Sequence, residues 1–129
     1  MEQAKDKLKA DLKFLQKAVG TLEIALREPF TEIVRDAVIQ RFECSFELSW
    51  KTLQVAGAYV GSPCNSPREA IKCGFKMGWI KNPDHWFEAM EARNRTSHVY
   101  NPVVAQEVYE VAKKFPLLTE EIIGAVDNL

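Results

Sequence analysis

The segment from Leu8 to Leu26 distributes apolar and polar positions in the manner of an amphipathic helix. Apolar residues recur at steps of four and three, which places them on one side of a helix of about six turns. This stripe consists of Leu8, Leu12, Leu15, Val19, Leu22 and Leu26. Pro29 predicts the end of the helix, because proline restrains the residue before it and has no amide proton to donate.

A second, longer helix is predicted between Thr31 and Val60. Thr31 is suited to cap its start, no proline interrupts it, and apolar residues from Ile33 to Leu53 mark a wide face. About 28 residues at 1.5 Å each would span about 42 Å. Two long helices joined by a short link must lie antiparallel to bury their apolar faces together, which predicts a helical bundle.

Prolines that follow capping residues divide the rest of the chain. Ser66-Pro67 predicts a short helix that stops near Gly78, and Asn82-Pro83 predicts another that runs toward Thr96. Pro102 opens a fifth segment, and Pro116 is expected to separate it from a last amphipathic stretch, 117–129. No segment alternates with a period of two. We therefore predict an all-α protein, an antiparallel up-and-down four-helix bundle with additional short helices, in a single domain over residues 1–129.

Composition excludes several classes of protein. Seventeen Lys and Arg against eighteen Asp and Glu give a net charge of −1, which excludes a strongly basic nucleic-acid binder but leaves a local basic patch open. No apolar run is long enough to cross a membrane, and the first residues lack an apolar signal segment. We therefore expect a cytoplasmic protein that does not contact a membrane.

The candidate metal ligands do not combine into a known site. Cys44, Cys64 and Cys73 are odd in number and lack a C-x-x-C pair, and two histidines are too few for zinc, so buried or half-buried thiols are expected. Glu43 and Glu47 lie one helical turn apart, but without a Glu-x-x-His partner they favour a partly buried ion pair at Glu47 over a di-iron site. No metal or cofactor is expected.

The segment 93–100, R-N-R-T-S-H-V-Y, has the densest cluster of chemically active side chains. Arginine matches phosphate oxygens, and histidine exchanges protons near neutral pH. Without a metal, such a pair suits cleavage of RNA, with His98 moving a proton and Arg93 stabilising the charge that builds on phosphorus. Because a regular helix would place these two about 140° apart, either the helix unwinds near Ser97 or the site is assembled across a dimer. A solvated helix end with a structural histidine remains the alternative.

Three blocks of this sequence resemble one family. Arg93, Asn94, His98 and Tyr100 match the pattern R-N-x3-H-x-Y, an instance of the R-x4–6-H motif of the HEPN superfamily. The segment 38–51 resembles the long second helix of the HepT-like group, the nucleotidyltransferase substrate-binding family. Ser66-Pro67-Arg68-Glu69-Ala70 and Asn82-Pro83-Asp84 fall where that family begins helices. The resemblance covers nearly the whole chain.

The resemblance implies a function and a partner. Relatives form homodimers and are encoded beside a minimal nucleotidyltransferase. It implies an RNA-cleaving toxin with Arg93 and His98 as the catalytic pair and Asn94 as a polar supporter. The nucleotidyltransferase would be the antitoxin and would adenylylate Tyr100. The alternative is a non-catalytic substrate-binding subunit of the nucleotidyltransferase, and a bundle with only an assembly role is a third interpretation.

Two further sets of residues could contact RNA or a partner. Lys76, Lys81 and Arg95 are candidates for nucleic-acid contact, although a solvated basic face explains them as well. Trp86, near the start of the helix that leads to the motif, is the tryptophan best placed to form an interface.

Overall fold

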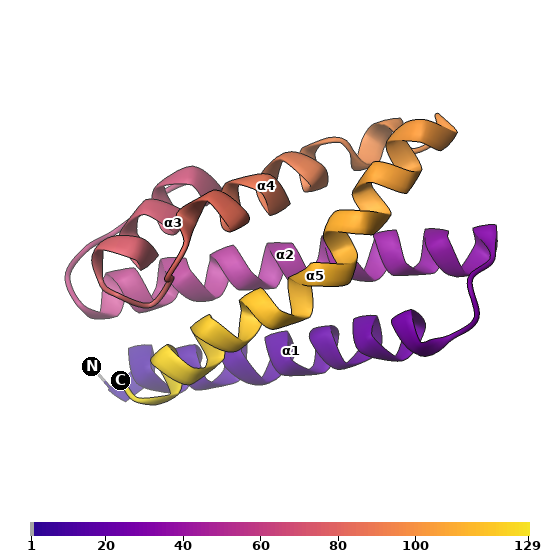
Figure 1. The fold of residues 1–129 in the computed structure, drawn as a ribbon. Helices are drawn as coiled ribbons and strands as arrows, with labels where there is room; N and C mark the ends of the chain where they lie inside the picture. Colours follow the sequence, from indigo (N-terminus) through magenta and orange to yellow (C-terminus); the bar gives the residue numbers. More distant parts are fainter. Residues whose placement is uncertain (1) are drawn as a thin grey trace.

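The computed structural model describes residues 2–129, which contain five α-helices and no strand. The helices are α1 (Glu2–Arg27), α2 (Glu32–Tyr59), α3 (Pro67–Lys76), α4 (Pro83–Asn94) and α5 (Pro102–Asp127), with a 3-10 turn, η1, at Thr96–His98. α1, α2, α4 and α5 run in alternating directions, and α5 crosses α2 and α1 at an angle (Figure 1). The predicted all-α bundle with additional short helices is confirmed.

The helices begin where the sequence predicts. Thr31 Oγ1 accepts a hydrogen bond from the amide of Val34 at 3.0 Å, and Ser66 Oγ accepts one from the amide of Glu69 at 3.2 Å. Asn82 caps α4 in the same way, ahead of a proline in the first turn. Each cap supplies an acceptor to an amide that has no partner inside the helix, which fixes the starting residue locally.

The core is built around aromatic side chains of α2, α4 and α5. The ring of Phe115 meets Phe42 edge-to-face at 5.2 Å and Trp86 at 5.4 Å, measured between ring centroids. Trp86 is only 1% exposed, so its predicted role at an interface is wrong. Its position in the chain could not show this, because the side chain is buried by contacts with distant helices. The apolar stripe of α1 packs against the same core, with Leu26 only half-buried.

α5 is continuous, which corrects the prediction that Pro116 separates two segments. Pro116 cannot donate to the carbonyl of Ala112, and a proline inside a helix costs about 3 kcal/mol. Phe115 and Ile122, on either side of it, are fully buried in the core. Burying each such side chain contributes about 1.5–3 kcal/mol, so tertiary packing is sufficient to keep the helix continuous.

The three cysteines form no disulfide, and they differ in their exposure to solvent. Cys64 and Cys73 are buried, as expected, whereas Cys44 is exposed on α2. Burial, followed by the neighbouring Cys73, raises the pKa of the Cys64 thiol. Cys64 is therefore a weak nucleophile in the folded protein.

Across residues 2–129, none of the helices combines the length and the apolar character that crossing a membrane requires.

We predict that Pro116→Ala stabilises the protein. An alanine restores the amide proton that the carbonyl of Ala112 lacks, so the free energy of unfolding should rise by about 1–3 kcal/mol in urea titrations. Pro102→Ala is the matched control, because Pro102 occupies the first turn of α5, where no helical bond is restored. A Pro116→Ala protein no more stable than the Pro102→Ala control would contradict this account.

Candidate functional site

The segment 93–100 (the motif segment) lies where α4 ends and η1 begins. The amide of Arg95 bonds to the carbonyls of Glu91 and Ala92, and the amide of His98 bonds to the carbonyl of Arg95 at 2.9 Å. The regular helix therefore stops at Asn94, and the chain tightens into η1 before His98. This is the unwinding near Ser97 that the sequence offered as one of two possibilities.

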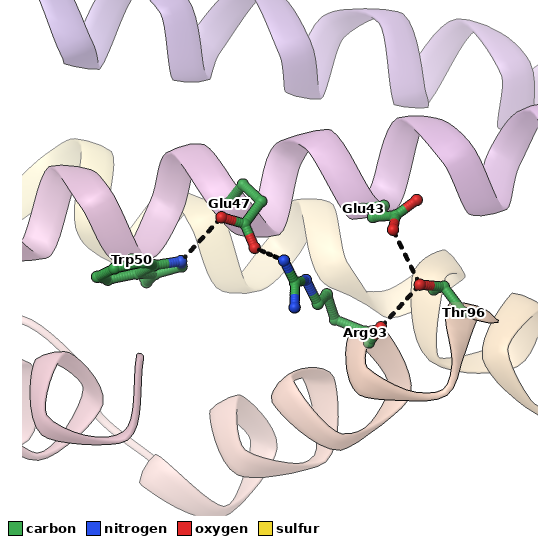
Figure 2. A network of polar contacts seen from close by, with 5 residues as sticks. All are labelled: Glu43, Glu47, Trp50, Arg93 and Thr96. Carbon is green, nitrogen blue, oxygen red and sulfur yellow. Dashed lines mark hydrogen bonds and ion pairs between the residues drawn. The ribbon is translucent and has the colours of Figure 1, made fainter. Parts of the chain in front are cut away.

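Arg93 reaches from the last turn of α4 to α2. Its Nη2 forms an ion pair with Glu47 Oε1, and the other carboxylate oxygen of Glu47 accepts a hydrogen bond from Trp50 Nε1 at 3.2 Å (Figure 2). The side chains of Arg93 and Glu47 are 35% and 28% exposed, which confirms the predicted partly buried ion pair at Glu47. Arg93 Nε is buried and has no hydrogen-bond partner among the described residues.

Thr96 forms a second contact between the motif segment and α2. Its Oγ1 lies 2.9 Å from Glu43 Oε2 and 2.8 Å from the carbonyl oxygen of Arg93, so its one proton is shared between two acceptors (Figure 2). A carboxylate is the stronger acceptor of the two, because it is charged. Sequence reasoning missed this contact, and its only signal was the pair of carboxylates one turn apart on α2.

His98 and Tyr100 lie together on the solvent-exposed turn before α5. Their ring centroids are 6.1 Å apart with the planes at 67°, and Tyr100 is 83% exposed. Within residues 2–129, no hydrogen bond or ion pair joins either of them to Arg93. Asn94 is exposed beside Arg93. The structure thus brings His98 to Tyr100 and Arg93 to Glu47, but it leaves the two pairs without a direct contact in one chain.

The basic residues proposed to contact RNA are scattered. Arg95 Nη1 pairs with Glu107 Oε2 at 2.7 Å, in a hollow between α4 and α5 that further carboxylates line, Glu88, Glu91 and Glu110. Lys76 and Lys81 are exposed before the start of α4, and the twelve residues of that helix span about 18 Å. The three side chains therefore form no single patch with Arg93, and their contact with RNA stays a prediction.

An open hollow lies beside Arg93, and the carboxylates in its lining make the binding of an anion there less favourable. It is lined by residues of α2 and by Arg93, namely Gln40, Glu43, Cys44, Glu47, Leu48 and Arg93. An anion that enters must compete with Glu47 for the guanidinium. Nowhere in residues 2–129 do three or more His, Cys, Asp or Glu side chains gather as a metal site requires.

Comparisons with known proteins point to one family and one fold. Residues 10–125 match the model of the family described as nucleotidyltransferase substrate binding protein like. The structure is similar to the crystal structure of ttk003001694 from Thermus thermophilus, with 30% identity, a TM-score of 0.80, and coverage of 87% of this chain and 98% of that one.

The structure is also similar to HI0074 from Haemophilus influenzae, whose structure is described as revealing the fold of a substrate binding domain of a nucleotidyltransferase. Identity is 21%, the TM-score is 0.65, and the likeness covers 95% of this chain and 98% of that one. At this identity the likeness shows a shared fold. No curated protein gives a significant match.

We predict that Glu47→Ala destabilises the protein by about 1–3 kcal/mol, because it leaves the half-buried guanidinium of Arg93 without its charged partner. Glu107→Ala is the matched control, since it removes the partner of the more exposed Arg95, and it should cost no more than about 1 kcal/mol. Urea unfolding of both variants measures the difference. Equal losses of stability would show that the Arg93–Glu47 pair contributes no more than a surface pair.

Proposed function

The chain belongs to the nucleotidyltransferase substrate-binding protein family, and from this premise we propose that it is the partner of a minimal nucleotidyltransferase that adenylylates Tyr100. The observation that carries the proposal is the position of Tyr100, 83% exposed on the turn between η1 and α5. In the reaction, the phenolic oxygen of Tyr100 attacks the α-phosphorus of ATP. Pyrophosphate leaves, the phenol loses its proton, and an adenylyl ester remains on the ring.

Tyr100 is the tyrosine that an enzyme can reach most easily. Tyr59 and Tyr109 are both only partly exposed. The ring of Tyr109 also packs edge-to-face against Phe30 at 5.2 Å, and Lys113 Nζ lies 5.6 Å from its centroid. A transferase that must place a phenol oxygen in its own active site therefore has one freely presented acceptor.

Tyr100→Phe should abolish adenylylation by the partner nucleotidyltransferase, because it removes the attacking oxygen and leaves the ring. Tyr59→Phe and Tyr109→Phe are matched controls and should be modified at the wild-type rate. Incorporation of labelled adenylate, located by mass spectrometry of peptides, measures both. Persistent modification of the Tyr100→Phe protein would reject Tyr100 as the acceptor.

RNA cleavage by Arg93 and His98 is the second candidate function, and it would make the chain the toxin of a toxin–antitoxin pair. Two observations favour it: the helix unwinds before His98, which leaves the imidazole exposed, and Arg93 Nε has no partner within residues 2–129. His98 would transfer a proton at the 2′-hydroxyl or the leaving oxygen, and Arg93 would exchange Glu47 for the scissile phosphate. An adenylyl group on Tyr100 would then block RNA through its bulk and its charge.

A homodimer is part of this second proposal. Arg93 and His98 share no contact within one chain, so a site that uses both together is better assembled from Arg93 of one copy and His98 of another. The non-catalytic alternative, a subunit that only presents a substrate to the nucleotidyltransferase, needs neither cleavage nor this assembly.

Purified protein in excess EDTA should cleave RNA. His98→Ala should slow cleavage about 100-fold or more, as loss of a general acid–base group does, and Arg93→Ala should slow it by about the same factor, as loss of a group that stabilises transition-state charge does. His85→Ala, at the chain's other histidine, is the matched control and should cleave like the wild type. A mixture of the His98→Ala and Arg93→Ala proteins should regain part of the activity if two copies share the site.

If the folded wild-type protein leaves RNA intact while Tyr100 is still adenylylated, the RNA-cleavage proposal is rejected. The substrate-binding function is then the one that the result supports.

A further inference from the structure

Two carboxylates of α2, Glu43 and Glu47, face the segment 93–100. The proposed functions give Glu43 no role, and they use Glu47 only as the partner that Arg93 would leave for a phosphate. We propose that Glu43 and Glu47 form a clamp that holds the segment 93–100 against α2, and that Thr96 is the positioning residue through which this clamp fixes His98 and Tyr100. The clamp is defined by two contacts, Glu47 with Arg93 and Glu43 with Thr96 (Figure 2). The proposal deepens the proposed function and rests on it only for its effect on Tyr100.

Both carboxylates of the clamp lie on a part of α2 that is fixed by the hydrophobic core. Each carboxylate directly follows a core aromatic residue, Phe42 before Glu43 and Phe46 before Glu47, and both rings are almost fully buried. Burial of these rings fixes the rotation of α2 about its axis, which in turn fixes the side from which the carboxylates project. Two carboxylates one turn apart repel each other on an isolated helix, and here each of them meets a donor from the motif segment instead.

Besides the clamp, the motif segment is held by Val99, which is half-buried and packs against the core, and by few other contacts. No residue of η1 is buried, and no side chain caps its start. Its backbone bonds are confined to short turns, such as Asn101 N to the carbonyl of His98 at 3.1 Å. The other charged tether, Arg95 to Glu107, is between two exposed side chains, where solvent and salt weaken an ion pair. The half-buried hydroxyl of Thr96, which donates to a charged acceptor, is the stronger tether.

The clamp has a consequence for recognition. A partner that docks on an ordered turn does not have to order it, whereas a partner that docks on a loose turn loses part of its binding energy in ordering the segment. Release of Thr96 should therefore weaken the encounter with Tyr100 while leaving the chemistry of the phenol unchanged. In kinetic terms, KM for this protein as a substrate rises and kcat stays the same.

Amide hydrogen exchange tests the clamp without any partner. Thr96→Val removes the donor and keeps the shape of the side chain, so the amides of His98 and Asn101 should exchange about three to ten times faster, while core amides such as that of Leu15 are unchanged. Thr96→Ser keeps a hydroxyl and should exchange like the wild type. Glu43→Gln should also accelerate exchange, and the Glu43→Gln/Thr96→Val double variant should be no faster than Thr96→Val alone.

Exchange in Thr96→Val at the wild-type rate would overturn the clamp, and so would a Thr96→Ser protein that behaves like Thr96→Val, because the hydroxyl would then not be the group that matters. Additive effects of the two single variants would show that Glu43 and Thr96 act separately, which also overturns it.

A second test measures the kinetics with which the partner nucleotidyltransferase adenylylates the variants. Adenylylation of Thr96→Val should show KM raised about threefold or more with kcat within about twofold of wild type, and Thr96→Ser should restore KM. A fall in kcat alone would contradict the positioning role. If wild-type protein is not adenylylated at all, the proposed function fails, whereas hydrogen exchange still decides whether the clamp exists.

Discussion

Phe115 is the residue at which three helices of this bundle meet, and the geometry of the candidate site depends on its packing. From α5 it contacts Phe42 of α2 and Trp86 of α4 edge-to-face, with all three rings almost fully buried. Rings of this size dominate core energetics, and their edge-to-face contacts favour particular orientations. The aromatic cluster therefore sets the position of α4 relative to α2, and that position brings Arg93 within reach of Glu47. The same burial offsets the cost of Pro116, the next residue in α5.

The polar network of the site follows from the register of the core. Phe42 and Phe46 are separated by one helical turn and face inward, so the residues that follow them, Glu43 and Glu47, also lie one turn apart, at the edge of the buried face. A side chain at such an edge is partly shielded from solvent, so a hydrogen bond to its carboxylate contributes more than it would on an open surface. The apolar pattern of α2 thus decides which polar residues can meet the motif.

What could be predicted from the sequence is what depends on neighbouring residues. Thr31, Ser66 and Asn82 mark helix starts because a cap acts on amides only two or three residues away. The continuity of α5 across Pro116 and the burial of Trp86 could not be predicted, since both are decided by packing between distant helices. At the site, an ion pair at Glu47 was predictable from its surroundings on α2, but the bond between Thr96 and Glu43 joins residues 53 positions apart and depends on how α4 lies against α2.

The exposure of Tyr100 has a consequence for how long any modified form would persist. A side chain that buries almost none of its surface contributes almost nothing to the difference in free energy between the folded and unfolded chain. A group attached there leaves the population of unfolded molecules unchanged, and proteases that act on unfolded chains would remove both forms at the same rate. The ratio of modified to unmodified protein would then record only the enzymes that add and remove the group, independently of protein turnover.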